Sequence, residues 1–171
     1  MRSLESFFTE DRLDRETLRR AVEDDAAGAL LIFEGVVRNH SEGHTGIVAL
    51  EYEVKRPMAD NMVAAILKET QTEIPFLKAA VRHRMGRTKL REPTVIIAVS
   101  AAHRDEAYRA SRRIIDRIKH EAPIWKREIF ADGTSEWSLG CTACDPPLPN
   151  ASTGSAHRPN TPSGEGLKVL R

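Results

Sequence analysis

The chain has 171 residues, 40% of them hydrophobic and 30% charged, which fits one globular domain with or without a tail. Its 26 Lys and Arg residues nearly balance its 25 Asp and Glu residues, and this formal charge of +1 argues against a general nucleic-acid-binding protein. Two cysteines cannot form a disulfide framework, no apolar run approaches the ~20 residues that span a bilayer, and no signal peptide is visible, so the composition predicts a soluble, cytoplasmic protein.

The last 33 residues, 139–171, differ in composition from the rest. Seventeen of them are Gly, Pro, Ser, Thr or Asn, and they hold five of the nine prolines. Such a segment buries too little apolar surface to offset its conformational entropy, so we predict a folded domain in residues 1–138 and a disordered tail in 139–171. The tail contains one CxxC pair, Cys141 and Cys144, with His157 nearby. A structural zinc site needs four ligands, so this pair does not predict one.

The first half of the folded domain alternates between helix and strand patterns. Residues 14–22 place apolar side chains at helical spacing after an N-cap candidate, Asp14, and predict a short helix. Residues 28–37 (GALLIFEGVV) are apolar and bounded by glycine, which predicts a buried strand, and the polar residues 38–46 predict a loop. Residues 47–54 alternate as a strand. The side chains on its one apolar face are Val48, Leu50, Tyr52 and Val54.

The middle of the chain predicts a helix followed by two strands. Residues 57–72 form a helical pattern in which Pro57 occupies the first turn, where its missing N–H costs nothing. The positions at helical spacing are Met58, Met62, Ala65, Ile66 and Glu69. Residues 76–84 and 94–101 predict strands, and residues 86–93 predict the connector between them.

The last elements of the domain are a long helix and a strand. Residues 103–121 are amphipathic, and Pro123 ends the helix. Residues 124–131 predict a strand, followed by an Asp132–Gly133 turn. Strands interrupted by helices fit either an α/β or an α+β domain; the short connections between several strands favour α+β, with a mixed, mainly antiparallel sheet and packed helices.

Lys119 is the first candidate for chemistry. On a helical projection, the apolar arc of residues 103–121 runs through Ile114 and Ile118 to Tyr108, and Lys119 lies just beyond that border. Partial burial there would favour a neutral, nucleophilic amine. Equally, Lys119 could lay its aliphatic stem on the core and keep its ammonium group in water.

Lys126 lies close to Lys119 in this prediction, because only the tight bend at Pro123 separates them. Strand alternation places Lys126 and Glu128 on one face and Arg127 on the other. Two ammonium groups held together attract an anion, so the pair predicts a phosphate or oxyanion site. The alternative is that Lys126 and Glu128 form an exposed surface pair worth under ~1 kcal/mol.

Two further cationic sites stand apart from this pair. Arg38 follows the first predicted strand, and His103 and Arg104 begin the long helix, where free N–H groups favour anions, although they also fit a plain exposed pair. Arg104 and Lys119 are 15 residues apart, about 22 Å along a helix. One small substrate touches both ends only if a symmetric dimer brings the helix start of one copy to the helix end of the other.

Five segments in order resemble the large, catalytic subunit of molybdopterin synthase. They are FEGVVRNHSEG (33–43), LEYEVKRPMA (50–59), VRHRMG (81–86), SAAHRDEAY (100–108) and IKHEAPIWKRE (118–128). The resemblance covers residues 28–137. It implies a hammerhead-like α+β fold and the conversion of cyclic pyranopterin monophosphate to molybdopterin by installing two sulfurs as a dithiolene. The implied sulfur donor is a thiocarboxylate on the C-terminal Gly-Gly of a small ubiquitin-like subunit, in a heterotetramer built around a homodimer of large subunits, with no metal or other cofactor in this step.

The resemblance also assigns residues. Lys119 matches the family's principal catalytic lysine, and the second lysine block corresponds to Lys126, Arg127 and Glu128. Arg38 matches the strand-end arginine, with Val36 and Val37 lining the substrate beside it. His103 and Arg104 match a His-Arg pair, which we expect to serve the neighbouring subunit's pocket.

The chain departs from the family pattern at two positions of the connector, where Thr88 and Arg91 replace an expected leucine and glycine. We therefore expect this turn to differ from the family's. Two other functions are weighed against the enzyme: a non-catalytic adaptor that binds the sulfur carrier, and an RNA- or phosphate-binding module that uses the helix of residues 104–117. The second has only Tyr108 and Trp125 as stacking aromatics near that helix.

Overall fold

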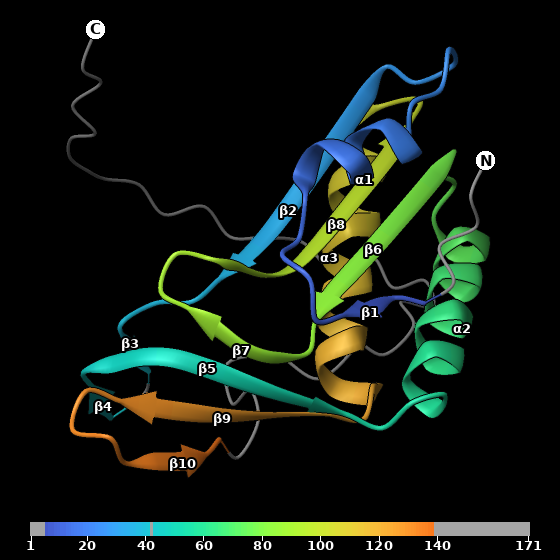
Figure 1. Cartoon of the computed structure of the whole chain (residues 1–171). Coiled ribbons are helices and arrows are strands. Elements are labelled where there is room, and N and C mark those ends of the chain that lie inside the picture. The colour runs from blue at the N-terminus through green and yellow to red at the C-terminus, as the bar shows by residue number, and fades with distance from the viewer. Residues whose placement is uncertain (1–5, 42, 139–171) are drawn as a thin grey trace, which may run out of the picture.

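A computed structural model describes residues 6–41 and 43–138 (Figure 1). The tail prediction for residues 139–171, with its Cys141–Cys144 pair, lies outside the described residues. The elements in chain order are β1 (Phe8–Thr9), α1 (Arg15–Ala21), β2 (Ala29–Val36), β3 (His40–Ser41), β4 (His44–Thr45), β5 (Ile47–Val54), α2 (Met58–Glu73), β6 (Lys78–Arg84), β7 (Gly86–Lys89), β8 (Pro93–Ala101), α3 (Arg104–Glu121), β9 (Ile124–Phe130) and β10 (Ser135–Trp137).

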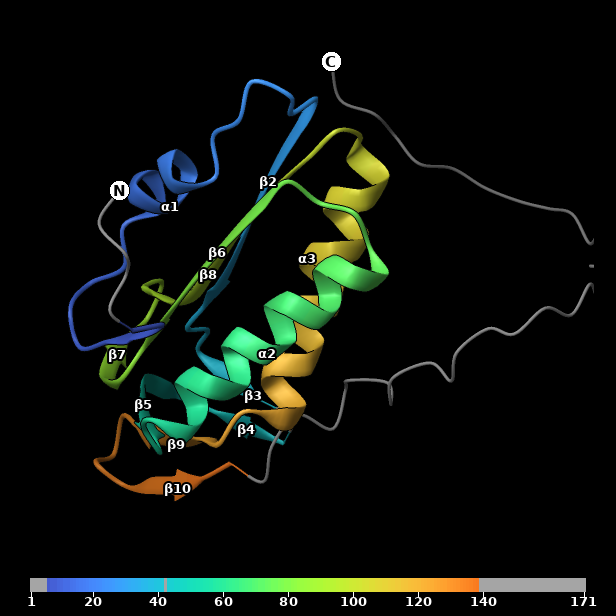
Figure 2. The same ribbon diagram turned by 90° about the vertical axis from the view of Figure 1, so that its right-hand side faces the viewer.

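The first sheet forms the body of the molecule and has the strand order β1-β6-β8-β2. Only β1 and β6 pair in parallel; the other pairs are antiparallel. Helices α2 and α3 cover one face of this sheet and α1 covers the other (Figure 2). The larger core lies under α2 and α3, and a smaller one lies under α1. Apolar side chains on both faces explain why β8 is buried over nearly its whole length.

The second sheet has the order β10-β9-β5-β7 and lies at the end of the molecule where α3 finishes (Figure 1). All of its pairs are antiparallel. In register, Tyr52 of β5 lies opposite Lys126 of β9 and Gly86 of β7. The α+β class with packed helices and mainly antiparallel strands is therefore confirmed, in two four-stranded sheets.

Helix boundaries follow the local signals in the sequence. The Asp14 carboxylate accepts hydrogen bonds from the backbone N–H groups of Glu16 and Thr17 at 3.1 and 3.2 Å, as an N-cap does. α3 ends at Glu121, and the chain turns at Pro123, whose carbonyl accepts a hydrogen bond from the Lys55 N–H at 3.1 Å. The turn at Gly133 is also present, with φ at 86°.

Several short strands were not predicted. The connector of residues 86–93 contains β7, and the predicted loop of residues 38–46 contains the two-residue pair β3 and β4. β1 and β10 were missed as well. Strands of two to four residues carry no readable periodicity, and pairing with a neighbouring strand is what orders them.

The observed burial of four predicted elements also differs from the prediction. β2 is half-buried rather than buried, because it is the edge strand of its sheet. The buried face of α2 comprises Ala59, Val63, Ile66 and Thr70, which leaves Met58 50% exposed. Tyr108 on α3 is 61% exposed, outside the apolar arc. In β5 the alternation breaks at a bulge between Ile47 and Ala49, so that Ala49 and Leu50 are both buried.

The connector turn is unusual at the position where the family pattern has glycine. Arg91 has φ at 65°, in the left-handed region that favours glycine. Its N–H donates to the Val37 carbonyl at 2.9 Å, and the Val37 N–H donates to the Glu92 carbonyl at 3.1 Å. These two bonds fasten the end of β2, and with it the start of the segment that carries Arg38, to the turn.

Candidate functional site

The bend between α3 and β9 brings Lys119 and Lys126 to one end of the molecule. Lys119 occupies the last turn of α3 and is exposed. Lys126 is the third residue of β9, and its side chain is 34% exposed. Because Lys126 lies directly opposite Tyr52 on an antiparallel neighbour, the two side chains share one face of the sheet.

A buried histidine lies where the chain passes from the first sheet into the second. His83, at the end of β6, is 7% exposed and meets the Tyr52 ring edge-on, with ring centroids 4.9 Å apart. Burial lowers the pKa of His83 to about 4, and the positive charge of Lys119 adds to this effect. His83 thus contacts Tyr52, which lies opposite Lys126 in strand register.

Glu128 is the buried acid of this region. It is 5% exposed; the Ser41 hydroxyl donates to its Oε2 at 2.7 Å, and the Lys126 ammonium nitrogen lies 3.4 Å from its Oε1. The two side chains do form the pair that the alternative expects, but Glu128 is buried, so the pair does not lie on an exposed surface. Glu128 holds the segment that follows Arg38 against β9 and orients Lys126 at the same time. Burying a carboxylate is tolerable only with such partners.

Arg127 lies on the opposite face of β9. Its guanidinium forms an ion pair with Glu51 and stacks over the Trp137 ring, with its Cζ 5.3 Å from the ring centroid. Its charge is thus already compensated. The structure separates Arg127 from Lys126 and Glu128, as strand alternation predicts.

The remaining predicted site residues lie at the end of β2 and at the start of α3. Val37 is 2% exposed and belongs to a small core with Ile47, whereas Val36 is 52% exposed. Arg38 follows them and is exposed. His103 is the N-cap of α3 but makes no side-chain capping bond, and the exposed Arg104 is the first residue of the helix. This pair lies at the far end of α3 from Lys119 (Figure 1), so the structure does not bring the two ends together within one chain.

Ion pairing distinguishes these cations from others on α3. Arg109 pairs with Asp105 at 2.8 Å, and Arg117 pairs with Glu69 and Glu121 at 2.7 and 2.6 Å. Arg38, Arg104 and Lys119 make no side-chain hydrogen bond or ion pair within the part of the chain that the structure describes. Most arginines of the helix behind the RNA-binding alternative are thus ion-paired, whereas these three predicted anion ligands have no counter-ion among the described residues.

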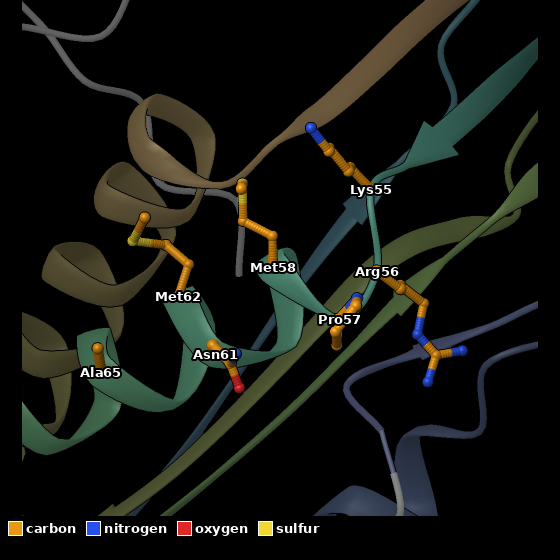
Figure 3. Close-up of a pocket in the computed structure, with 7 residues that line it drawn as sticks. All are labelled: Lys55, Arg56, Pro57, Met58, Asn61, Met62 and Ala65. Atoms are coloured by element: carbon orange, nitrogen blue, oxygen red, sulfur yellow. The ribbon is translucent and has the colours of Figure 1, made fainter.

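A cavity that the sequence did not predict opens beside this region. Its volume is about 560 Å³, and it lies where β5 passes into α2 (Figure 3). The lining residues are Lys55, Arg56, Pro57, Met58, Asn61, Met62 and Ala65. Figure 3 shows Met58 and Met62 projecting from α2 on the side that faces α3. None of the predicted site residues lines this cavity. The offset between the predicted and observed faces of α2 explains why Met58 was assigned to the core.

Among residues 6–41 and 43–138, no three His, Cys, Asp or Glu side chains converge in a way that could hold a metal ion. No helix in the same residues combines the length and apolar character needed to cross a membrane.

An α+β domain of two mainly antiparallel sheets with packed helices is a fold that known proteins share. The crystal structure of molybdopterin synthase from Staphylococcus aureus matches 78% of this chain and 96% of that chain, with a TM-score of 0.72 and 35% identity. Residues 8–121 match the family model described as MoaE protein. The chain belongs to the MoaE family, which confirms the resemblance seen in the sequence.

Two further comparisons identify a similar protein sequence and a similar structure. The molybdopterin synthase catalytic subunit of Thermoplasma volcanium is 43% identical over 130 residues, covering 76% of this chain and 94% of that protein. A structure from Helicobacter pylori, described as a complex of subunits 1 and 2 of molybdopterin-converting factor, matches with a TM-score of 0.63. At 18% identity, that match supports the fold alone.

Proposed function

We propose that this protein is the catalytic subunit of a molybdopterin synthase. In this role it converts cyclic pyranopterin monophosphate to molybdopterin, with sulfur from the thiocarboxylated C-terminal Gly-Gly of a small carrier subunit. The observation that carries the proposal is an unpaired Lys119 at the end of α3 and a Glu128-paired Lys126 in the strand that follows, in a chain of the MoaE family. The same proposal places the protein in the cytoplasm.

The chemistry assigns a role to each cation. The phosphate of the substrate needs cationic anchors, for which Arg38, Lys126 and the Arg104 of a second copy are suitable. Sulfur transfer from a thiocarboxylate passes through a tetrahedral oxyanion, which a nearby ammonium group stabilises. Lys119 is the candidate for moving protons when the cyclic phosphate opens, since no carboxylate among the described residues neutralises it.

The edge of the first sheet supports a site shared between two copies. β2 pairs with β8 on one side, and none of the described strands pairs with its other side. Leu30 and Val36 on this strand are 38% and 52% exposed. An apolar, unpaired edge is typical of an interface. Contact between two copies would bring the Arg104 of one toward the Lys119 of the other, whereas one chain holds them about 22 Å apart.

The partner is a small sulfur-carrier subunit. Support comes from family membership and from relatives named as the catalytic subunit of a synthase, a name that implies a further subunit. The competing function is a non-catalytic adaptor that binds the same partner. Retention of every predicted cation, with Arg38, Arg104 and Lys119 unpaired among the described residues, favours the enzyme over the adaptor.

The test combines the purified protein with a thiocarboxylated carrier and cyclic pyranopterin monophosphate, and measures the dithiolene product. We expect product with the wild-type chain, none with Lys119→Ala, and undiminished binding of the carrier by that variant. Lys68→Ala, at an exposed lysine of α2, is the matched control and should keep full turnover. Carrier binding without product by the wild-type protein would favour the adaptor, and turnover by Lys119→Ala would reject the role of Lys119.

A further inference from the structure

Ser41 is a polar side chain at the candidate site that the proposed chemistry does not use. It lies in β3, within the hairpin that β3 and β4 form shortly after Arg38. Its hydroxyl donates to the Glu128 carboxylate of β9 at 2.7 Å, although the two residues are 87 positions apart in the chain. Such a bond can serve only to fasten the hairpin to the second sheet. The Lys126 ammonium beside the same carboxylate indicates a further role.

The two oxygens of the Glu128 carboxylate have different partners. Oε2 accepts the hydrogen bond from Ser41 at 2.7 Å, whereas Oε1 lies 3.4 Å from the Lys126 ammonium nitrogen. A tight hydrogen bond between an ammonium group and a carboxylate measures about 2.7–2.9 Å, so the contact with Lys126 is a loose one. An ammonium group has three N–H donors, and this side chain is 34% exposed. Lys126 therefore keeps donors that an anion can reach.

Two further titratable groups lie near the same carboxylate. His44 Nδ1 is 3.9 Å from Oε2 of Glu128 and 3.7 Å from Glu136 of β10, too far for a hydrogen bond to either. Tyr52 of β5 stays protonated, since burial raises its pKa to about 12 and the charge of Glu128 adds to this effect. Among the described residues, Ser41 is thus the one hydrogen-bond donor to Oε2.

We propose that Ser41 is a positioning residue. Its bond to Oε2 stops the Glu128 carboxylate from turning both oxygens toward Lys126, and so keeps that ammonium group open to the phosphate of the substrate. This proposal rests on the proposed role of Lys126 as a phosphate anchor. Without the hydroxyl, Oε2 is a buried acceptor without a partner, which is unfavourable. A closer ion pair with Lys126 would satisfy it, and that ion pair would compete with the substrate anion.

Three substitutions separate this role from simple fastening. Ser41→Ala removes the hydroxyl and Ser41→Thr keeps it. Thr45→Ala is the matched control, because Thr45 is an exposed residue of the same hairpin whose hydroxyl makes no hydrogen bond among the described residues. In the complete assay with carrier and cyclic pyranopterin monophosphate, we expect Ser41→Ala to raise the KM for the pterin about tenfold, as the loss of a hydrogen bond to a charged group does, with kcat nearly unchanged.

The other two variants should keep the KM of the wild type. If the bond only fastens the hairpin, Ser41→Ala will lower Tm and leave KM unchanged, and that result would overturn the proposal.

Titration with inorganic phosphate tests the inference whether or not the protein makes product. NMR of the ¹⁵N-labelled lysine side chains reports on the Lys126 ammonium directly, and Lys126→Ala identifies its signal. We expect phosphate to shift this signal in the wild type and in Thr45→Ala, with an apparent Kd about tenfold higher in Ser41→Ala.

Equal phosphate affinities of the wild type and Ser41→Ala, or a Lys126 signal that phosphate does not shift in the wild type, would refute the positioning role. The expected phosphate titration without product from the wild type would contradict the proposed function and leave the role of Ser41 at Lys126 supported.

Discussion

The left-handed backbone at Arg91 provides a direct test of how this sequence departs from its family. A non-glycine residue in that conformation costs roughly 1–2 kcal/mol, because its Cβ crowds the following carbonyl. Arg91 is exposed, and its side chain makes no hydrogen bond or ion pair within the described residues. Arg91→Gly removes the strain and keeps the backbone bond to Val37, but adds roughly 0.5–1 kcal/mol of unfolded-state entropy. The balance predicts a variant that is more stable by about 0.5–1 kcal/mol.

The assay is equilibrium unfolding in urea or by heat, in which such a gain raises Tm by about 2–4 °C for a domain of this size. Arg87→Gly is the matched control, because Arg87 is also an exposed arginine of the same connector but lies in β7, paired with Glu51 in strand register. There glycine should destabilise the protein by roughly 0.5–1 kcal/mol. If both substitutions change stability in the same direction, the strain argument fails.

Two further predictions concern stability. Since His83 has its pKa lowered to about 4 in the folded chain against 6.5 in the unfolded one, its contribution is present above pH 6.5 and lost as pH falls toward 4. The free energy of unfolding should therefore drop by about 3 kcal/mol more over this range in the wild type than in His83→Gln, and parallel curves from denaturant titrations would contradict this. Gly28→Ala places a Cβ 2.4 Å from the backbone oxygen of Ala102. We expect a loss of roughly 1–3 kcal/mol by thermal unfolding, whereas an unchanged Tm would mean that this contact relaxes freely.

The sequence predicted the long elements and missed the short ones for one physical reason. β5, β8 and α3 each extend over enough residues for an apolar period to emerge, and their observed bounds lie within a residue or two of the prediction. β7 has four residues and is ordered by pairing with β5. Its Thr88 is fully buried although a single threonine in a polar connector gives no sign of it. Partner strands supply information that local pattern does not contain.

The sequence pattern also does not determine which face of a helix is buried. The apolar residues of α2 form two overlapping stripes one position apart, one through Met58 and Met62 and the other through Ala59 and Val63. Periodicity alone does not choose between them. The structure buries Ala59 completely and leaves Met58 half-exposed, as close packing of a helix through small side chains requires. Because Met58 is left half-exposed, it lines the cavity beside α2.

Predicting the candidate site requires both the sequence pattern and the contacts that form in the folded chain. Sequence alone identified the cations and placed Lys119 at the border of the apolar arc of α3, but it does not show which cations of this helix have counter-ions. Pairing separates them: Arg117 is neutralised by Glu69 of α2 and by Glu121 of its own helix, whereas no carboxylate among the described residues pairs with Lys119. On the side of α3 that meets α2, acidic side chains thus pair with the arginines. The end of α3 that meets β5 and β9 keeps an unpaired lysine, which can bind an anion. A charge is available for catalysis only where the fold supplies no counter-ion, and Lys119 has none among the described residues.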